Sequence, residues 1–278
     1  MASVVDLITY PVKGCAGVRV SQAQLTPAGL PHDRSFMVTD TGGVFRSQRR
    51  DPRLALIRPE PSPDGERLTL RAPGQEPLEV AVDLESARGD VELFGEPFRA
   101  IDQGAAVARW LSDFLGKDSR LVRVPPEHDR IADGLTPGTS GWADSSPLHM
   151  ISLASLDELN RRITEAGRDP LPMSRFRPNI VVDGWSEPHR EDLARHIEVG
   201  DTALAFAKLA VRCAVTLVDQ DTGAKPGPEP LRTLATYRRG PDKGVIFGSK
   251  FSVLRTGKLG LGDELGVTAW ESHTGTGS

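Results

Sequence analysis

Cys213 is the residue of this chain whose type and neighbours are best suited to chemistry. It follows Arg212, and an acidic turn, Asp219-Gln220-Asp221-Thr222-Gly223, comes a few positions later. A cationic neighbour favours ionisation of a thiol, and a thiolate is both a nucleophile and a soft metal ligand. The run 211–218 is β-like, however, and its alternation would also suit Cys213 as a small buried hydrophobe. These residues alone leave both interpretations open.

A second group of polar side chains stands at the start of an apolar strand predicted at 180–182. Arg175, Arg177 and Asn179 form a dense set of hydrogen-bond donors there. Such a set suits a phosphate group or a polar heterocycle. The alternative is a pair of surface arginines that pack along Phe176.

Composition limits the classes of protein. A chain of 278 residues suits one large domain or two small ones. The charge is balanced, with 34 Lys and Arg against 38 Asp and Glu, so bulk electrostatics favour neither nucleic acid nor an anionic membrane as a partner.

The first residues contain no long apolar run, and no later stretch approaches a membrane span, so we expect a cytoplasmic protein without a signal peptide. The two cysteines, Cys15 and Cys213, are too few for a zinc framework or an iron–sulfur cluster, and we expect no disulfide between them.

The elements that must position these residues differ between the two halves of the chain. From residue 4 to about 99, short alternating segments separated by Pro, Gly and Asp turns predict a small β-barrel or sandwich. Helical spacing at 104–116 predicts a helix that links the halves. We therefore expect an N-terminal domain at 1–100, a second domain at 101–270 and a disordered tail at 271–278.

The second half mixes strands with helices. We predict a strand at 149–153 that runs into a helix at Ser155, where Ser155 and Glu158 have the spacing of a capping box. Further strands are predicted at 196–199 and 203–218, with barrel strands from 244 to 270. The loop at 125–147 is long enough to be functional, and we expect it to contact substrate.

Several motifs occur together and in a fixed order along the chain. They are Tyr10-Pro11-Val12-Lys13-Gly14-Cys15, Asp33-Arg34, Asp144-Ser145-Ser146-Pro147, Arg175-Phe176-Arg177-Pro178-Asn179, Arg212-Cys213 with Asp219-Gln220-Asp221-Thr222-Gly223, and Glu229-Pro230-Leu231 with Tyr237-Arg238. Together they resemble the MOSC family in its two-part form, as in the mitochondrial amidoxime-reducing component and its bacterial relatives. The likeness covers roughly residues 4 to 269. It implies a mostly β, α+β fold with several helices, in which a small N-terminal β-barrel packs with a MOSC β-barrel domain.

The resemblance implies the molybdenum cofactor, molybdenum bound to molybdopterin, as the bound group. Cys213 stands at the position of the family's metal ligand, which also makes it catalytic, and Arg212 beside it is a further cofactor-binding candidate. The motif positions imply pterin and phosphate contacts from Lys13, Gly14, Arg34, Arg177 and Asn179.

Asp144 and Ser145 stand where the family has polar residues that face the cofactor, and Asp144 is a further catalytic candidate. Both could equally structure the approach to Pro147. One departure is Gly14, where family members often have serine, so that only its backbone can serve. Cys15 is expected to be a buried thiol without chemistry.

The function implied is that of a molybdenum-dependent, pyridoxal-phosphate-independent oxidoreductase that reduces small N-hydroxylated compounds, in the manner of a detoxification enzyme. The chain has no cysteine cluster for a fused ferredoxin, so we expect electrons from a separate protein, such as a ferredoxin or a cytochrome b5-like protein. The alternative is a carrier that delivers molybdenum cofactor, or passes sulfur as a persulfide, on the same Cys213.

Overall fold

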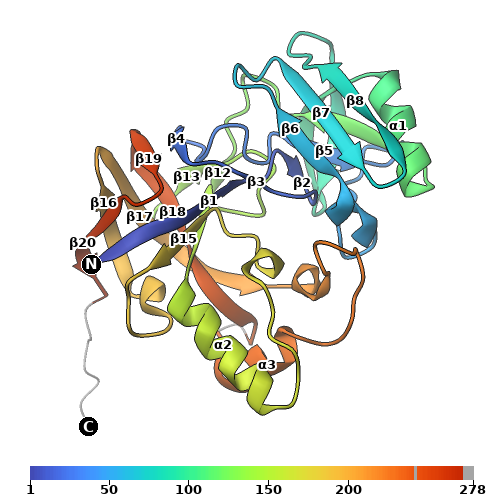
Figure 1. Ribbon diagram of the computed structural model, residues 1–278. Coiled ribbons are helices and arrows are strands. Elements are labelled where there is room, and N and C mark those ends of the chain that lie inside the picture. The colour runs from blue at the N-terminus through green and yellow to red at the C-terminus, as the bar shows by residue number, and fades with distance from the viewer. Residues whose placement is uncertain (241–242, 272–278) are drawn as a thin grey trace.

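The computed structural model describes residues 1–240 and 243–271 and is mostly β (Figure 1). Three α-helices accompany the strands within these residues: α1 (Ala105–Leu115), α2 (Leu153–Glu165) and α3 (Leu231–Tyr237). The predicted fold class, α+β with a barrel, is confirmed. Across the described part of the chain, no helix is long and apolar enough to cross a membrane.

Seven strands of the second half and the N-terminus close into a barrel. Their order is β15-β14-β18-β17-β16-β20-β1, and β1 pairs back to β15 to close the ring. The ring has no free edge, and its interior is filled by buried apolar side chains such as Leu7, Leu204 and Phe251. The strands are β1 (Ala2–Thr9), β14 (Leu148–Ser152), β15 (Ile180–Asp183), β16 (Ala194–Val199), β17 (Thr202–Arg212), β18 (Val245–Arg255) and β20 (Glu264–Trp270), with β3 (Val18–Arg19) beside β1.

The N-terminal half contains two smaller sheets that share one core. Helix α1 packs there too, with Leu111 in the same apolar cluster as Phe36 and Leu68 (Figure 1). One sheet has the order β2 (Val12–Lys13), β5 (Phe36–Thr39), β11 (Arg120–Arg123), β10 (Glu96–Asp102) and β9 (Arg88–Leu93). The other has the order β6 (Arg58–Pro61), β7 (Arg67–Ala72) and β8 (Gln75–Ala81).

The chain passes between the halves more than once. Strand β1 belongs to the barrel, the chain then builds most of the N-terminal sheets, and β11 completes the five-stranded sheet after α1. The division into 1–100 and 101–270 stays a prediction. The predicted tail, apart from Glu271, lies outside the described residues.

Helix α2 begins earlier than the sequence predicts. Its N-cap is Ser152, whose hydroxyl accepts a hydrogen bond from the backbone N–H of Ser155 at 3.1 Å. The predicted capping box was therefore wrong: Glu158 pairs with Arg161 and Arg162 on the helix surface. The buried Glu191 explains why Ser152 is the cap. Its carboxylate accepts hydrogen bonds from the hydroxyls of Ser152 and Ser155, at 2.9 and 2.7 Å, and holds the two side chains together.

The strand predicted at 203–218 was also wrong beyond Arg212, where β17 ends. A 3-10 turn at Ala214–Leu217 follows. Thr216 causes the bend, since its backbone N–H and its hydroxyl both donate to the Cys213 carbonyl, at 3.1 and 2.9 Å. Such local side-chain bonding competes with a strand despite the β-branched sequence.

Short paired segments complete the fold. The predicted loop at 125–147 contains a small hairpin of β12 (Ile131–Ala132) and β13 (Gly138–Thr139). Strands β4 (Gln22–Gln24) and β19 (Lys258–Gly260) pair near the barrel. The 3-10 segments are Pro52–Leu56, Met173–Arg175, Arg190–Asp192 and Ala214–Leu217.

Candidate functional site

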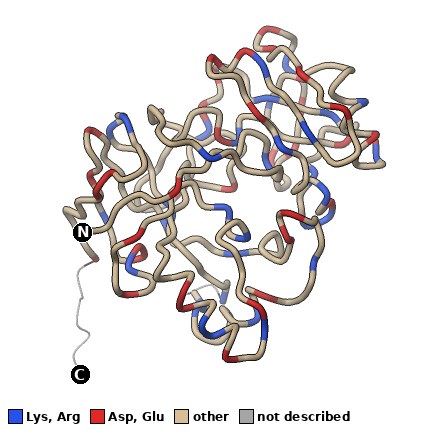
Figure 2. Tube along the Cα trace, in the orientation of Figure 1, with Lys and Arg blue, Asp and Glu red and all other residues tan. Residues whose placement is uncertain are grey.

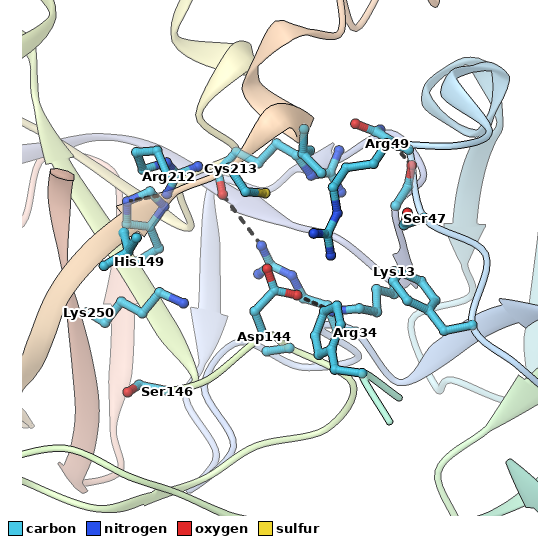
Figure 3. A pocket seen from close by; sticks show the side chains of 18 of the residues that line it. Lys13, Arg34, Ser47, Arg49, Asp144, Ser146, His149, Arg212, Cys213 and Lys250 are labelled. Atoms are coloured by element: carbon cyan, nitrogen blue, oxygen red, sulfur yellow. Dashed lines mark hydrogen bonds and ion pairs between the residues drawn. The ribbon is translucent and has the colours of Figure 1, made fainter. Parts of the chain in front are cut away.

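An open cleft between the two halves gathers most of the predicted site residues. It encloses about 860 Å³, including space open to solvent. The side chains of Cys213, Arg212, Lys13 and Asp144 gather around it (Figure 3). The lining residues are Lys13, Gly14, Arg34, Phe45, Ser47, Gln48, Arg49, Phe94, Ala143, Asp144, Ser146, His149, Arg177, Asn179, Val211, Arg212, Cys213, Val215 and Lys250.

Cys213 lies at the point where β17 ends and the 3-10 turn begins. This change of direction takes the thiol off the sheet and into the cleft, where it is partly exposed. Cys15 is different: it is buried, and burial raises the pKa of its thiol to about 12. The interpretation of Cys213 as a buried hydrophobe does not fit this exposure, whereas Cys15 is the buried thiol that was expected.

Lys13 and Asp144 form an ion pair across the cleft. The Lys13 ammonium is buried and lies 5.0 Å from the ring centroids of both Phe45 and Phe94. Burial lowers the pKa of Lys13, while Asp144 acts in the opposite direction. Burial acts to raise the pKa of Asp144, but the charges of Lys13 and Lys250 lower it well below its usual range. Since the Asp144 side chain is 59% exposed to the open cleft, the two cations decide its state, and it is a carboxylate at neutral pH.

Arg34 and Arg177 stack on one aromatic ring. Their guanidinium carbons lie 4.5 and 4.2 Å from the ring centroid of Tyr10. Both arginines have left-handed backbones, with φ of 46° for Arg34 and 54° for Arg177, a region that side chains larger than glycine rarely adopt. Such strain persists only where surrounding contacts enforce it, and it concentrates at functional sites.

Asn179 supplies part of that enforcement. Its side-chain oxygen accepts from Arg34 at 2.9 Å and from the His149 backbone at 3.2 Å. Its amide nitrogen donates to Ile8 at 3.1 Å and to Asp33 at 3.0 Å. These four bonds use the whole hydrogen-bonding capacity of the amide. Asn179 therefore supports Arg34 and also lines the cleft, and its direct contact with the pterin stays a prediction.

Three further polar groups, Arg212, His149 and Lys250, line the cleft together with Cys213. Arg212 donates to the Phe176 carbonyl at 2.8 Å, and burial lowers its pKa to about 10, which leaves it a cation at neutral pH. Burial, together with the charge of Arg212, lowers the pKa of His149 well below its usual value, so this ring is neutral. Burial likewise lowers the pKa of Lys250 to about 8, against the attraction of Asp144.

The backbone conformation at position 14 explains why a glycine stands there. Its φ is 82°, a conformation in which serine would be strained. The Gly14 carbonyl accepts a hydrogen bond from Gln48 at 2.6 Å, and Gln48 exchanges reciprocal amide bonds with Gln220 at 3.1 and 3.2 Å. This amide pair joins the N-terminal half to the turn that follows Cys213.

The sequence interpretation missed several lining residues and misplaced one. Ser145 does not line the cleft; its hydroxyl accepts from Lys250 at 2.5 Å, and the neighbouring Ser146 lines the cleft instead. The predicted loop at 125–147 contributes only its last residues. The missed residues are Phe45, Ser47, Gln48, Arg49, Phe94, Ala143, Ser146, His149, Val211, Val215 and Lys250. The run of arginines after Ser47 is a signal that could have identified part of this set, whereas Phe94 and Lys250 stand in ordinary strand and turn sequence.

Two family profiles match consecutive parts of the chain. The profile described as the MOSC N-terminal beta barrel domain matches residues 1–118, and the MOSC domain matches 137–266. The mitochondrial amidoxime reducing component 2 of Rattus norvegicus is 36% identical over 277 residues, which is 91% of this chain and 80% of that protein. The chain belongs to the MOSC family.

Further relatives of this MOSC chain are of two kinds, amidoxime-reducing components and molybdenum cofactor sulfurases. Mitochondrial amidoxime-reducing component 1 of Homo sapiens is 33% identical over 283 residues, or 95% of this chain and 82% of that protein. The molybdenum cofactor sulfurase of Danio rerio is 33% identical over 261 residues, or 87% of this chain but 31% of the much longer sulfurase. Most of this MOSC chain therefore resembles most of the first protein and one part of the second.

The cleft of this MOSC chain fits an anionic, sulfur-containing cofactor. Six cationic side chains line it, Lys13, Arg34, Arg49, Arg177, Arg212 and Lys250, against the single carboxylate of Asp144. Charges of both signs are spread over the described part of the chain (Figure 2), so this excess is local. The Arg212 Nε and the Ser146 hydroxyl are buried without a hydrogen-bond partner in residues 1–240 and 243–271. The same residues contain no cluster of three His, Cys, Asp or Glu side chains that could hold a metal. A metal here would need its other ligands from the cofactor itself, as a dithiolene provides.

Proposed function

We propose that this chain binds molybdenum cofactor in the cleft and reduces N-hydroxylated compounds, with Cys213 as the protein ligand of molybdenum. The observation that carries the proposal is a partly exposed thiol within a cleft lined by six cations and one carboxylate. A thiolate is a soft ligand, and the cations balance the charge of a phosphate and of the dithiolene sulfurs. The names of the amidoxime-reducing relatives support the reaction class.

When bound, the cofactor would supply the two-electron chemistry by which R–NHOH, two electrons and two protons become R–NH2 and water. Cys213 would hold the metal, and Lys13, Arg34, Arg177 and Arg212 would hold the anionic groups. Asp144, a carboxylate at neutral pH, is poorly suited to donate protons and serves to orient the Lys13 ammonium.

Lys250 is the better proton donor of the cleft. It lines the same space as Cys213, and the Ser145 hydroxyl fixes its Nζ at 2.5 Å. With a pKa of about 8 it carries a proton at neutral pH and can release it. Electrons would come from a separate donor protein, since the chain has only two cysteines and no cysteine cluster of its own.

Reduction of benzamidoxime by a chemical electron donor tests the proposal. Wild-type protein made in cells that synthesise the cofactor is expected to turn over benzamidoxime, and Cys213→Ala is expected to abolish the reaction with an unchanged circular dichroism spectrum. Cys15→Ala is the matched control, because it removes the other thiol of the chain and should leave turnover measurable. Wild-type rates in Cys213→Ala would contradict the proposal.

A carrier of cofactor or of persulfide sulfur is the second candidate, favoured by the similarity to molybdenum cofactor sulfurase over 87% of this chain. A carrier would bind molybdenum cofactor or accept sulfur on Cys213 yet fail to reduce any amidoxime. The same assay therefore separates the two, provided that the molybdenum content of the protein is measured beside it.

A further inference from the structure

Phe94 adopts a backbone conformation that phenylalanine rarely adopts. It forms, with Gly95, the two-residue turn between β9 and β10, where Leu93 pairs with Glu96. The φ values are 56° at Phe94 and 88° at Gly95. Turns with two positive φ values favour Asn-Gly, and a bulky residue at the first position is an outlier. The hairpin alone gives no reason for phenylalanine at this position.

Burial gives no reason either. The Phe94 side chain is 49% exposed, so much of its apolar surface remains in water. Its ring lines the cleft, packs edge-on against Phe45 with centroids 5.7 Å apart, and lies 5.6 Å from the Arg49 guanidinium. The strained turn thus presents a half-exposed aromatic ring to the cleft.

Two further apolar side chains line the cleft. Val211 is 61% exposed, and both Val211 and Val215 line the cleft on either side of Cys213 in the sequence. The polar groups Lys13, Arg212 and Lys250 line the same cleft. These apolar side chains stand among the six cations of the cleft, and aromatic or apolar surface beside convergent polar groups is the usual construction of a site for an organic ligand.

We propose that Phe94 is a specificity-determining residue whose ring selects substrates in which the N–OH group is attached to a planar aromatic system. This inference rests on the function proposed above and adds the substrate class: aromatic amidoximes and N-hydroxylated heteroaromatic bases bind in preference to small aliphatic N-hydroxy compounds. An aromatic contact of this kind favours the ring-bearing substrate about 3- to 10-fold.

The test compares benzamidoxime with acetamidoxime, which share the reacting group and differ by the ring. In Phe94→Asn, the ratio of kcat/KM for benzamidoxime to that for acetamidoxime is expected to fall about 3- to 10-fold, mainly through the KM for benzamidoxime. Phe94→Tyr is expected to retain most of the ratio. Leu261→Asn is the control, since Leu261 is 48% exposed in the turn before β20 and does not line the cleft.

Two readouts do not depend on turnover. Because asparagine suits the turn, Phe94→Asn is expected to melt at the same temperature as wild type or higher, which excludes a folding defect. Calorimetric titration of the molybdenum-loaded protein with benzamidoxime is expected to show weaker binding in Phe94→Asn than in Leu261→Asn. If neither the ratio nor the binding changes, the inference is overturned.

One other outcome also overturns it. The Phe94 ring lies 5.0 Å from the Lys13 ammonium, so a purely structural role would be to cover that cation. In that case Phe94→Asn would lose molybdenum and both substrates would suffer equally. A wild-type protein that reduces neither amidoxime would contradict the proposed function instead, and the titration would still decide whether Phe94 binds the ring.

Discussion

At the scale of single residues, motif positions located the cleft well. Lys13, Arg34, Arg177 and Cys213, far apart in the sequence, all line one space. Their roles were less predictable, because a role depends on which hydrogen bonds are already in use. Asn179 illustrates this: its residue type suggests a ligand contact, but four bonds within the protein occupy its amide.

Lys250 was beyond sequence reasoning for another reason. A lysine in a strand is usually solvated, and only the closed barrel places this one beside Asp144, Arg34 and Arg212. Its lowered pKa comes from burial, which no local sequence pattern encodes.

This lowered pKa predicts a pH-dependent stability. Below about pH 8, Lys250 is protonated in both the folded and the unfolded chain, and the folded state carries the full cost of burying the charge. As the pH rises above 8, Lys250 loses its proton in the folded chain before it does so in the unfolded chain. The cost of burying the charge therefore falls, and it vanishes once the pH exceeds the ordinary pKa of lysine. In cofactor-free protein, Lys250→Met should therefore raise the free energy of unfolding at pH 7 by about 2 kcal/mol relative to its effect at pH 10.

Urea unfolding of wild type and Lys250→Met at the two pH values measures this difference. The variant also loses the contact with the Ser145 hydroxyl, but that loss is common to both pH values and cancels. An equal effect of the substitution at pH 7 and pH 10 would show that the ammonium is not destabilised by burial.

At the scale of elements, alternation predicted most strands and helical spacing predicted the helix at 104–116, where α1 lies. The errors occurred where a side chain bonds to the backbone and changes the local path. Thr216 bends the chain after Cys213. Ser152 caps α2, three residues before Ser155, which was the predicted cap. The Ser152 cap depends on the buried Glu191, which only the folded chain supplies, whereas the Thr216 bond is local and competes with the β-branched pattern.

Gly248 in β18 provides an element-scale prediction. Its φ is 75°, and an added Cβ would lie 2.6 Å from Ile151 Cγ1 and 2.8 Å from the Met150 carbonyl in β14. Gly74, in the turn between β7 and β8, has a similar φ of 73° but open space around it. Both Gly→Ala variants carry the backbone strain, whereas only Gly248→Ala also crowds the β14–β18 pair.

We expect Gly74→Ala to cost about 1 kcal/mol of unfolding free energy and Gly248→Ala about 1 to 3 kcal/mol more. Chemical denaturation of the two variants beside wild type measures both values. Equal losses would mean that β14 and β18 can separate without cost at this position, contrary to the close packing described.

At the scale of the whole molecule, the cleft exists because the two halves meet. Strand β1 begins in the barrel, the N-terminal half supplies Lys13 and Arg34, and the barrel supplies Arg212 and Cys213. The Gln48–Gln220 pair and the Lys13–Asp144 pair connect the halves beside the cleft. The family resemblance predicted this two-part fold, but neither the closure of the barrel nor the exchange of strands follows from local patterns, since both require pairing between distant segments.

The central claim is that Cys213 is the protein ligand of molybdenum, and X-ray absorption at the molybdenum edge tests it most directly. Wild type and Cys15→Ala, produced in cells that make the cofactor, should contain near-stoichiometric molybdenum with the same sulfur neighbours. Cys213→Ser should either lose the metal or retain it with one sulfur neighbour fewer. Unchanged molybdenum content and unchanged sulfur coordination in Cys213→Ser would contradict the account.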